Sequence, residues 1–206
     1  MGNIKMAALY SWGCRRTKNL GVDKILEKFI LSKKTDDSEI LEILKKLQPY
    51  PSYQKLASIS EDKNPFSGKV IDVYWLGGEI LKNFGDLLPF HNFETLILLL
   101  SAEKNEKILQ KLLAEAEDCC VMPGIVKEIL KNQKAVVEYR RIEYRVGKFH
   151  FGVSTIKEIK RKFLKDLKVG DLISFHLGYG REKITASKKE SLEIWTKKTL
   201  DILNKK

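Results

Sequence analysis

The second half of this sequence contains, in succession, Ile125-Val126-Lys127-Glu128-Ile129-Leu130 and Ala135-Val136-Val137-Glu138-Tyr139. Both segments are short and rich in Val, Ile and Tyr, and the turn-like Lys131-Asn132-Gln133 separates them, which indicates two β-strands. Two more segments of this kind follow, at Tyr144 to Phe149 and at Leu172 to Leu177. Several short strands without long intervening helices predict a small closed or partly closed β-barrel, because closure removes exposed strand edges.

Turn and helix signals bound this barrel. We expect a turn at Arg140-Arg141, between the second and third strands, and another at Lys168-Val169-Gly170-Asp171, before the fourth. Beyond the strands, Ser187-Lys188-Lys189-Glu190 has the pattern of a capping box, with Ser187 as N-cap and Glu190 at N3. An apolar stripe follows at helical spacing, so we expect a C-terminal helix.

Residues 1–117 show helical periodicity instead. Helices are expected at 21–31, 39–47, 65–81 and 93–116. The second follows an N-cap among residues 36–38 and ends before Pro49, and the fourth is expected to contain a break and a new cap within 101–105. The predicted fold class is therefore α+β. An N-terminal α-helical domain (residues 1–117) precedes a small OB-like β-barrel with a C-terminal helix (residues 118–206).

The charge is unevenly distributed between these halves. The chain of 206 residues has a formal net charge of +11, and residues 118–206 hold 21 Lys and Arg against 11 Asp and Glu. A basic domain favours an acidic protein, nucleic acid or an anionic ligand as partner, although a solvated surface without a specific partner is an equal alternative. The three cysteines and the lack of an export signal argue against a disulfide framework.

The sequence has no pattern typical of a membrane span or of a signal peptide. The longest strongly apolar run, Leu96 to Leu100, is far short of the roughly 20 residues that cross a bilayer, and the N-terminal residues lack a signal-peptide pattern. We therefore expect a cytoplasmic location and no membrane partner.

Three ordered features give residues 118–206 a resemblance to a known family. The first is Cys119-Cys120-Val121-Met122-Pro123-Gly124-Ile125-Val126, a cysteine followed by mostly apolar residues and Pro-Gly before a strand. The second is Val169-Gly170-Asp171-Leu172-Ile173-Ser174-Phe175-His176-Leu177-Gly178-Tyr179, and the third is the C-terminal helix. Each is common alone, but in this order they resemble the HypC/HupF family of chaperones that assemble the iron centre of nickel–iron hydrogenases.

This resemblance implies an accessory protein rather than an enzyme. Such a protein binds the iron–sulfur protein HypD and the hydrogenase large-subunit precursor, and it carries a transient Fe(CN)2CO unit on a cysteine thiolate. Matched residue by residue, Cys119 is the functional cysteine, which binds iron and the partner, and His176 is either a second iron ligand or an acid/base group near Cys119. Pro123 and Gly124 belong to the same partner-binding segment. Thiolate and imidazole both suit iron; a structural alternative for His176 is a backbone hydrogen bond that holds the following turn.

The sequence departs from the family pattern at the cysteine. In typical members it directly follows the initiator methionine, whereas Cys119 is internal and follows Asp118, whose charge is expected to raise the pKa of the thiol. Cys120 replaces an apolar residue and is interpreted as a small buried hydrophobe. His91 and His150 match no part of the pattern and are interpreted as surface or packing residues.

The N-terminal domain carries a segment with Tyr74-Trp75-Leu76-Gly77, which is similar to an element of an uncharacterised prokaryotic family. A Tyr-Trp pair on an amphipathic helix is more often part of a core than of a binding site, so we expect Tyr74 and Trp75 to be buried.

Two other functions remain open. A basic OB-like barrel can bind single-stranded nucleic acid by stacking bases on exposed aromatic side chains, and Tyr139, Tyr144, Phe149 and Phe151 are the candidates. We consider nucleic acid the less favoured partner. The third possibility is a regulatory relative that docks on the same partners without carrying iron.

Overall fold

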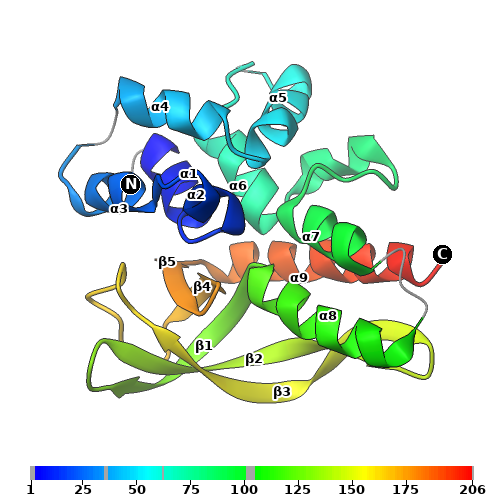
Figure 1. Cartoon of the computed structure of the whole chain (residues 1–206). Coiled ribbons are helices and arrows are strands. Elements are labelled where there is room, and N and C mark those ends of the chain that lie inside the picture. The colour runs from blue at the N-terminus through cyan, green and yellow to red at the C-terminus, as the bar shows by residue number, and fades with distance from the viewer. Residues whose placement is uncertain (1–2, 35–36, 62, 101–104, 206) are drawn as a thin grey trace. The chain divides into compact units, whose positions relative to one another are not determined.

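Figure 1 shows the computed structural model of the chain, which describes residues 3–34, 37–61, 63–100 and 105–205. Two compact units make up the chain, Met1–Phe90 and His91–Lys206. The second unit thus begins earlier than residue 118, where the periodicity of the sequence changes, and it includes two helices that precede the barrel. The class is α+β, as predicted.

All regular elements in the described residues of the first unit are helices. Its elements are α1 (Asn3–Ser11), α2 (Arg15–Asn19), α3 (Asp23–Leu31), α4 (Ser38–Lys45), α5 (Pro49–Ile59), α6 (Gly68–Leu76) and the 3-10 helix η1 (Glu79–Phe84). Asp37 caps α4 by accepting hydrogen bonds from the amides of Glu39 and Ile40, as expected of a residue in this position. Pro49 lies beyond the end of α4 and is the first residue of α5. A proline is well suited to this position, because the first backbone nitrogen of a helix has no hydrogen-bond partner within the helix.

One helix of this unit is shorter than predicted. The expected span 65–81 ends at Leu76, since Gly77 adopts a φ of 82°, which terminates an α-helix, and η1 follows. Tyr74 and Trp75 are buried, which confirms their assignment to a core. The ring of Trp75 stacks on Tyr10 with centroids 5.1 Å apart, and its Nε1 donates a hydrogen bond of 2.6 Å to the hydroxyl of Tyr53.

The second unit opens with α7 (His91–Leu100) and α8 (Glu106–Cys119). Asn105 caps α8, and its side-chain oxygen accepts hydrogen bonds from the amides of Lys107 and Ile108. This confirms a new cap at the end of the predicted break; the rest of that break, residues 101–104, lies outside the described residues.

Five strands form a closed barrel in the order β1-β2-β3-β5-β4, in which β1 pairs antiparallel with both β2 and β4. The strands are β1 (Met122–Leu130), β2 (Lys134–Arg145), β3 (Lys148–Lys160), β4 (Leu172–His176) and β5 (Tyr179–Lys183), and α9 (Ala186–Leu203) follows. The prediction of a small barrel with a C-terminal helix is confirmed. Side chains of α7, α8 and α9 share one hydrophobic core with the barrel, which includes Leu96, Leu113 and Leu200.

Three local predictions about this unit were wrong. The segment Tyr144 to Phe149 is not one strand, because it runs from the end of β2 through a turn to the start of β3. Arg140-Arg141 is not a turn, because β2 continues through it with a register shift between Arg140 and Ile142, and the chain reverses at Val146-Gly147, where both φ values are positive. The N-cap of α9 is Thr185, whose side chain accepts from the amide of Lys188, and not Ser187. Among the described residues, no helix combines the length and the apolar character that a membrane span requires.

Candidate metal centre

Three side chains of the second unit bring possible metal-binding atoms together. These are His91, the first residue of α7, Cys119, the last residue of α8, and His176, the last residue of β4. Their ligand atoms all lie within 4.8 Å of one another. Among the described residues, it is the one group of three or more His, Cys, Asp or Glu side chains whose possible ligand atoms lie close enough together to hold a metal ion.

The barrel places His176 beside Cys119. Strand β4 pairs with the start of β1, with Phe175 opposite Met122, so the end of β4 lies next to the residues that precede β1. The amide of Leu177 donates a hydrogen bond of 2.8 Å to the carbonyl oxygen of Asp118. Leu177 and Gly178 then turn the chain into β5 with positive φ values. His176 and Cys119 are thus held by backbone bonds that flank both residues.

Helix α7 supplies the third member. The Nε2 of His91 donates a hydrogen bond of 2.8 Å to the carbonyl oxygen of Cys119. Its ring lies against that of His176, with centroids 5.0 Å apart and planes at 79°. His91 and His176 are both buried, whereas Cys119 is partly exposed. His91 is therefore not a surface residue, and it belongs to a group that the sequence motifs only partly identified.

The environment keeps His91 neutral at ordinary pH. Burial is the main cause of a lowered pKa of about 4, and the positive charge of Arg181 lowers this pKa further. The hydrogen bond with the Cys119 carbonyl has the opposite effect and raises the pKa. Neutral imidazole is the form that binds metals, so His91 needs to lose no proton first.

The thiol of Cys119 has a raised pKa. Burial is the main cause, and Asp118 raises the pKa further, as predicted, whereas a hydrogen bond with the side chain of Thr95 lowers it. Its position at the C-terminal end of α8 also disfavours a thiolate, because the helix dipole is negative there. A metal ion at this site would displace the thiol proton on binding.

Arg181 is a functional candidate that the sequence analysis did not identify. Its side chain is fully buried in β5, and its Nη2 donates a hydrogen bond of 3.2 Å to the carbonyl oxygen of His176. The same atom lies 3.5 Å from Nδ1 of the His176 ring. A buried arginine is rare, and no sequence pattern distinguishes it from the many exposed cations of this basic half.

The remaining predicted site residues lie nearby but outside the group. Pro123 and Gly124 are buried in β1, opposite Ser174 and Ile173 of β4, and they line a hollow of 220 Å³ with residues of β2, β3 and α9. Cys120 is fully buried and its pKa is raised well above the usual value, mainly by burial, which confirms its interpretation as a small hydrophobe.

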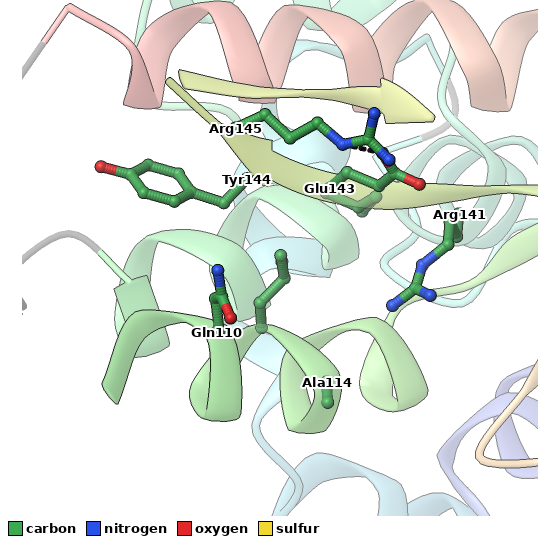
Figure 2. Close-up of a pocket in the computed structure, with 8 residues that line it drawn as sticks. Gln110, Ala114, Arg141, Glu143, Tyr144 and Arg145 are labelled. Atoms are coloured by element: carbon green, nitrogen blue, oxygen red, sulfur yellow. Dashed lines mark ion pairs between the residues drawn. The ribbon is translucent and has the colours of Figure 1, made fainter. Parts of the chain in front are cut away.

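A second hollow, of 270 Å³, lies between α8 and β2. Figure 2 shows its polar lining, which comprises Gln110, Arg141, Glu143, Tyr144 and Arg145. The guanidinium of Arg145 is paired with Glu143 at 2.9 Å. This hollow contains one carboxylate, Glu143, and one phenol, Tyr144, but no thiol or imidazole, so it offers fewer metal-binding groups than the histidine–cysteine group.

The aromatic candidates for nucleic-acid stacking are largely covered. Tyr139 and Phe149 are buried in the core of the second unit, and Arg140 lies over the ring of Phe151, 5.1 Å from its centroid. Stacking of bases needs exposed ring faces, so the geometry of these side chains disfavours base stacking.

The family comparison covers all three members of the group. A sequence family described as a family of unknown function (DUF6390) matches residues 85–206. No curated protein and no solved structure matches the chain.

Proposed function

The chain belongs to the DUF6390 family, and we propose that it is an accessory protein that carries an iron unit on Cys119 and His176 and transfers it to a partner. One observation carries this proposal. The two residues that the resemblance to HypC/HupF proteins singles out, far apart in the sequence, have their donor atoms within 4.8 Å of each other. A thiolate and an imidazole form a suitable donor set for iron.

The cargo is an iron that bears cyanide and carbonyl ligands, the Fe(CN)2CO unit, and the protein is a carrier without catalytic turnover. A thiolate suits this unit because it is a soft donor that can exchange between proteins. The partners are a HypD-like iron–sulfur protein as the source and a nickel–iron hydrogenase large-subunit precursor as the recipient, in the cytoplasm. The net positive charge of residues 118–206 favours both an anionic cargo and acidic docking surfaces.

The internal position of Cys119 changes how transfer has to occur. A cysteine at a chain terminus can reach into a partner. Cys119 instead lies at the end of α8, where His91 donates a hydrogen bond to the backbone carbonyl of Cys119 and holds it in place. Its thiol is partly exposed. The partner therefore has to approach the protein itself, and the hollow lined by Pro123 and Gly124 of β1, the strand that follows α8, offers a docking surface.

An anaerobic pull-down tests the proposal. The native protein and the variants Cys119→Ala, His176→Ala and Cys14→Ala are purified from cells that make HypD, and infrared spectra are recorded for iron-bound cyanide and carbonyl. We expect bands with the native protein and with Cys14→Ala, whose thiol lies in the first unit, and none with the other two variants. Recovery of HypD without bands would identify a docking relative, and recovery of neither would refute the proposed function.

A further inference from the structure

We infer that His91 is a third protein ligand, so that His91, Cys119 and His176 form a preorganised two-nitrogen, one-sulfur site for a borderline divalent transition metal. The inference deepens the proposed function because it concerns the same site. Binding of a metal ion alone tests it separately from any transfer of an iron unit. Nothing in the sequence motifs assigns a role to His91.

The hydrogen bond of His91 sets its tautomer. Because a carbonyl oxygen only accepts, the Nε2 of His91 carries the proton that bonds the Cys119 oxygen, at 2.8 Å. In the neutral ring the lone pair then lies on Nδ1, the nitrogen that can bind a metal. Histidine ligands usually donate their other N–H to a carbonyl or carboxylate in this way, which fixes the ring and increases its basicity. Here the carbonyl belongs to another proposed ligand, so His91 and Cys119 orient each other.

The distances fit a site that closes around an ion. Bonds of about 2.0 to 2.3 Å to a four-coordinate metal separate the ligand atoms by roughly 3.3 to 3.8 Å. One possible ligand atom of each residue lies within 4.8 Å of those of the other two, so an approach of about 1 Å is needed. Each residue stands at the end of its helix or strand, where side chains can adjust without breaking the element.

The donor set selects the class of metal. Two imidazoles and one thiolate suit zinc, cobalt(II) and iron(II), whereas magnesium and calcium require oxygen donors. Three protein ligands leave one open position on a four-coordinate ion such as cobalt(II), and three on a six-coordinate iron, which is the number of ligands that the Fe(CN)2CO unit brings. Arg181, which bonds the backbone of His176, adds a positive charge beside the metal, so an anion is the favoured external ligand. Cyanide on iron has this character.

Neighbouring contacts hold the group before any metal arrives. Asn92, the next residue of α7, bonds both backbone polar groups of Val121, and the amide of Leu177 bonds the carbonyl of Asp118. All three ligands are therefore fixed by backbone or side-chain bonds one or two residues away. Such preorganisation reduces the conformational entropy that binding has to overcome.

Cobalt(II) titration of the reduced, metal-free full chain under anaerobic conditions tests the inference. We expect one equivalent to bind, with a thiolate-to-cobalt charge-transfer band and the intense visible bands of four-coordinate cobalt. The variants are His91→Gln, which keeps an N–H donor for the Cys119 carbonyl, together with His91→Ala, Cys119→Ser and His176→Ala. The matched control is His150→Ala, because His150 is the remaining histidine of the chain and is partly exposed on β3.

The outcomes separate the two proposals. Loss of His91 should weaken cobalt binding by at least about tenfold and reduce the intensity of the visible bands, while His150→Ala binds like the native protein. Circular dichroism identifies variants that fail to fold, and His91→Gln decides the question if His91→Ala does. If both His91 variants bind cobalt like the native protein, whereas Cys119→Ser and His176→Ala no longer bind it, the role of His91 as a third ligand would be overturned and the proposed carrier function would stand. Cobalt binding that depends on all three residues, without infrared bands from cells, would support the site and refute the iron carrier. No binding by the native protein would overturn the inference.

Discussion

The side-chain amide of Asn92 pairs with both backbone polar groups of Val121, much as a neighbouring β-strand would. Its Nδ2 donates to the Val121 carbonyl and its Oδ1 accepts from the Val121 amide, each at 2.8 Å, and Nδ2 also donates to Thr196 Oγ1 at 2.9 Å. All three residues are buried. This arrangement joins α7 to the segment between α8 and β1, and it keeps His91 next to Cys119.

Replacement of Asn92 by Ala should therefore destabilise the second unit. It leaves the buried amide and carbonyl of Val121 without their partner, and each such group costs about 1–3 kcal/mol. We expect a loss of roughly 2–4 kcal/mol in urea unfolding and faster hydrogen exchange at the Val121 amide. Gln110→Ala is the control, because it removes an exposed amide from α8 of the same unit. Unchanged exchange at Val121 would show that the pairing does not hold this segment.

Glu117 predicts a pH dependence of stability. Its Oε1 accepts a hydrogen bond of 2.9 Å from the amide of Ile142, at the irregularity in β2, and burial raises its pKa despite this bond and the nearby charges of Arg141 and Lys157. A carboxyl group with a raised pKa in the folded state stabilises the protein below its unfolded pKa. That contribution is lost as the pH rises through the folded pKa.

Glu117→Gln keeps an oxygen acceptor for Ile142 and removes the titration. We therefore expect the stability of the variant relative to the native protein to increase as the pH rises from about 4 towards 7, the range above the usual glutamate pKa. Thermal unfolding at a series of pH values measures this difference. Glu115→Gln, on the exposed face of the same helix, is the control. A difference that is constant with pH would contradict the assignment.

Thr95 should tune the reactivity of the proposed iron ligand. Its side chain hydrogen-bonds Cys119 and lowers the pKa of a thiol that burial otherwise raises. Thr95→Val removes this bond with little change in shape, so less thiolate is present at a given pH and alkylation by iodoacetamide becomes slower. The measurement uses a Cys14→Ser, Cys120→Ala background, in which Cys119 is the remaining thiol. Thr155→Val, on β3, is the control; equal rates in all three proteins would refute a role for Thr95.

The strands were more predictable than the turns between them. Val, Ile and Tyr in β1, β2 and β4 indicate strands because these side chains pack on a pleated, half-buried surface. The position of the β2–β3 turn was mispredicted because Arg140-Arg141 resembles a polar loop. In the barrel the two arginines remain within β2, where an irregular register and the hydrogen bond from Ile142 to Glu117 accommodate them. Glu117 comes from α8, so this support has no local sequence signal.

The candidate site was predicted in part, for a similar reason. Cys119 and His176 stand in ordered motifs, and the barrel brings their donor atoms together with that of His91. No motif surrounds His91; its one available signal is its position next to Pro89-Phe90 at the start of a helix, which does not indicate a ligand. Arg181 was missed because nothing in the sequence distinguishes an arginine that becomes buried from one that stays exposed.

By itself, the sequence determined the helical first half, the barrel with its C-terminal helix, and the cysteine and histidine on which the proposed carrier function rests. These features follow from local periodicity, turn chemistry and short motifs, which act over a few residues. Only the tertiary structure decided that His91, Cys119 and His176 meet beside Arg181. Their meeting depends on the pairing of β4 with β1 and on the bonds that hold α7 against the start of β1, and such contacts between distant residues arise when the whole unit packs.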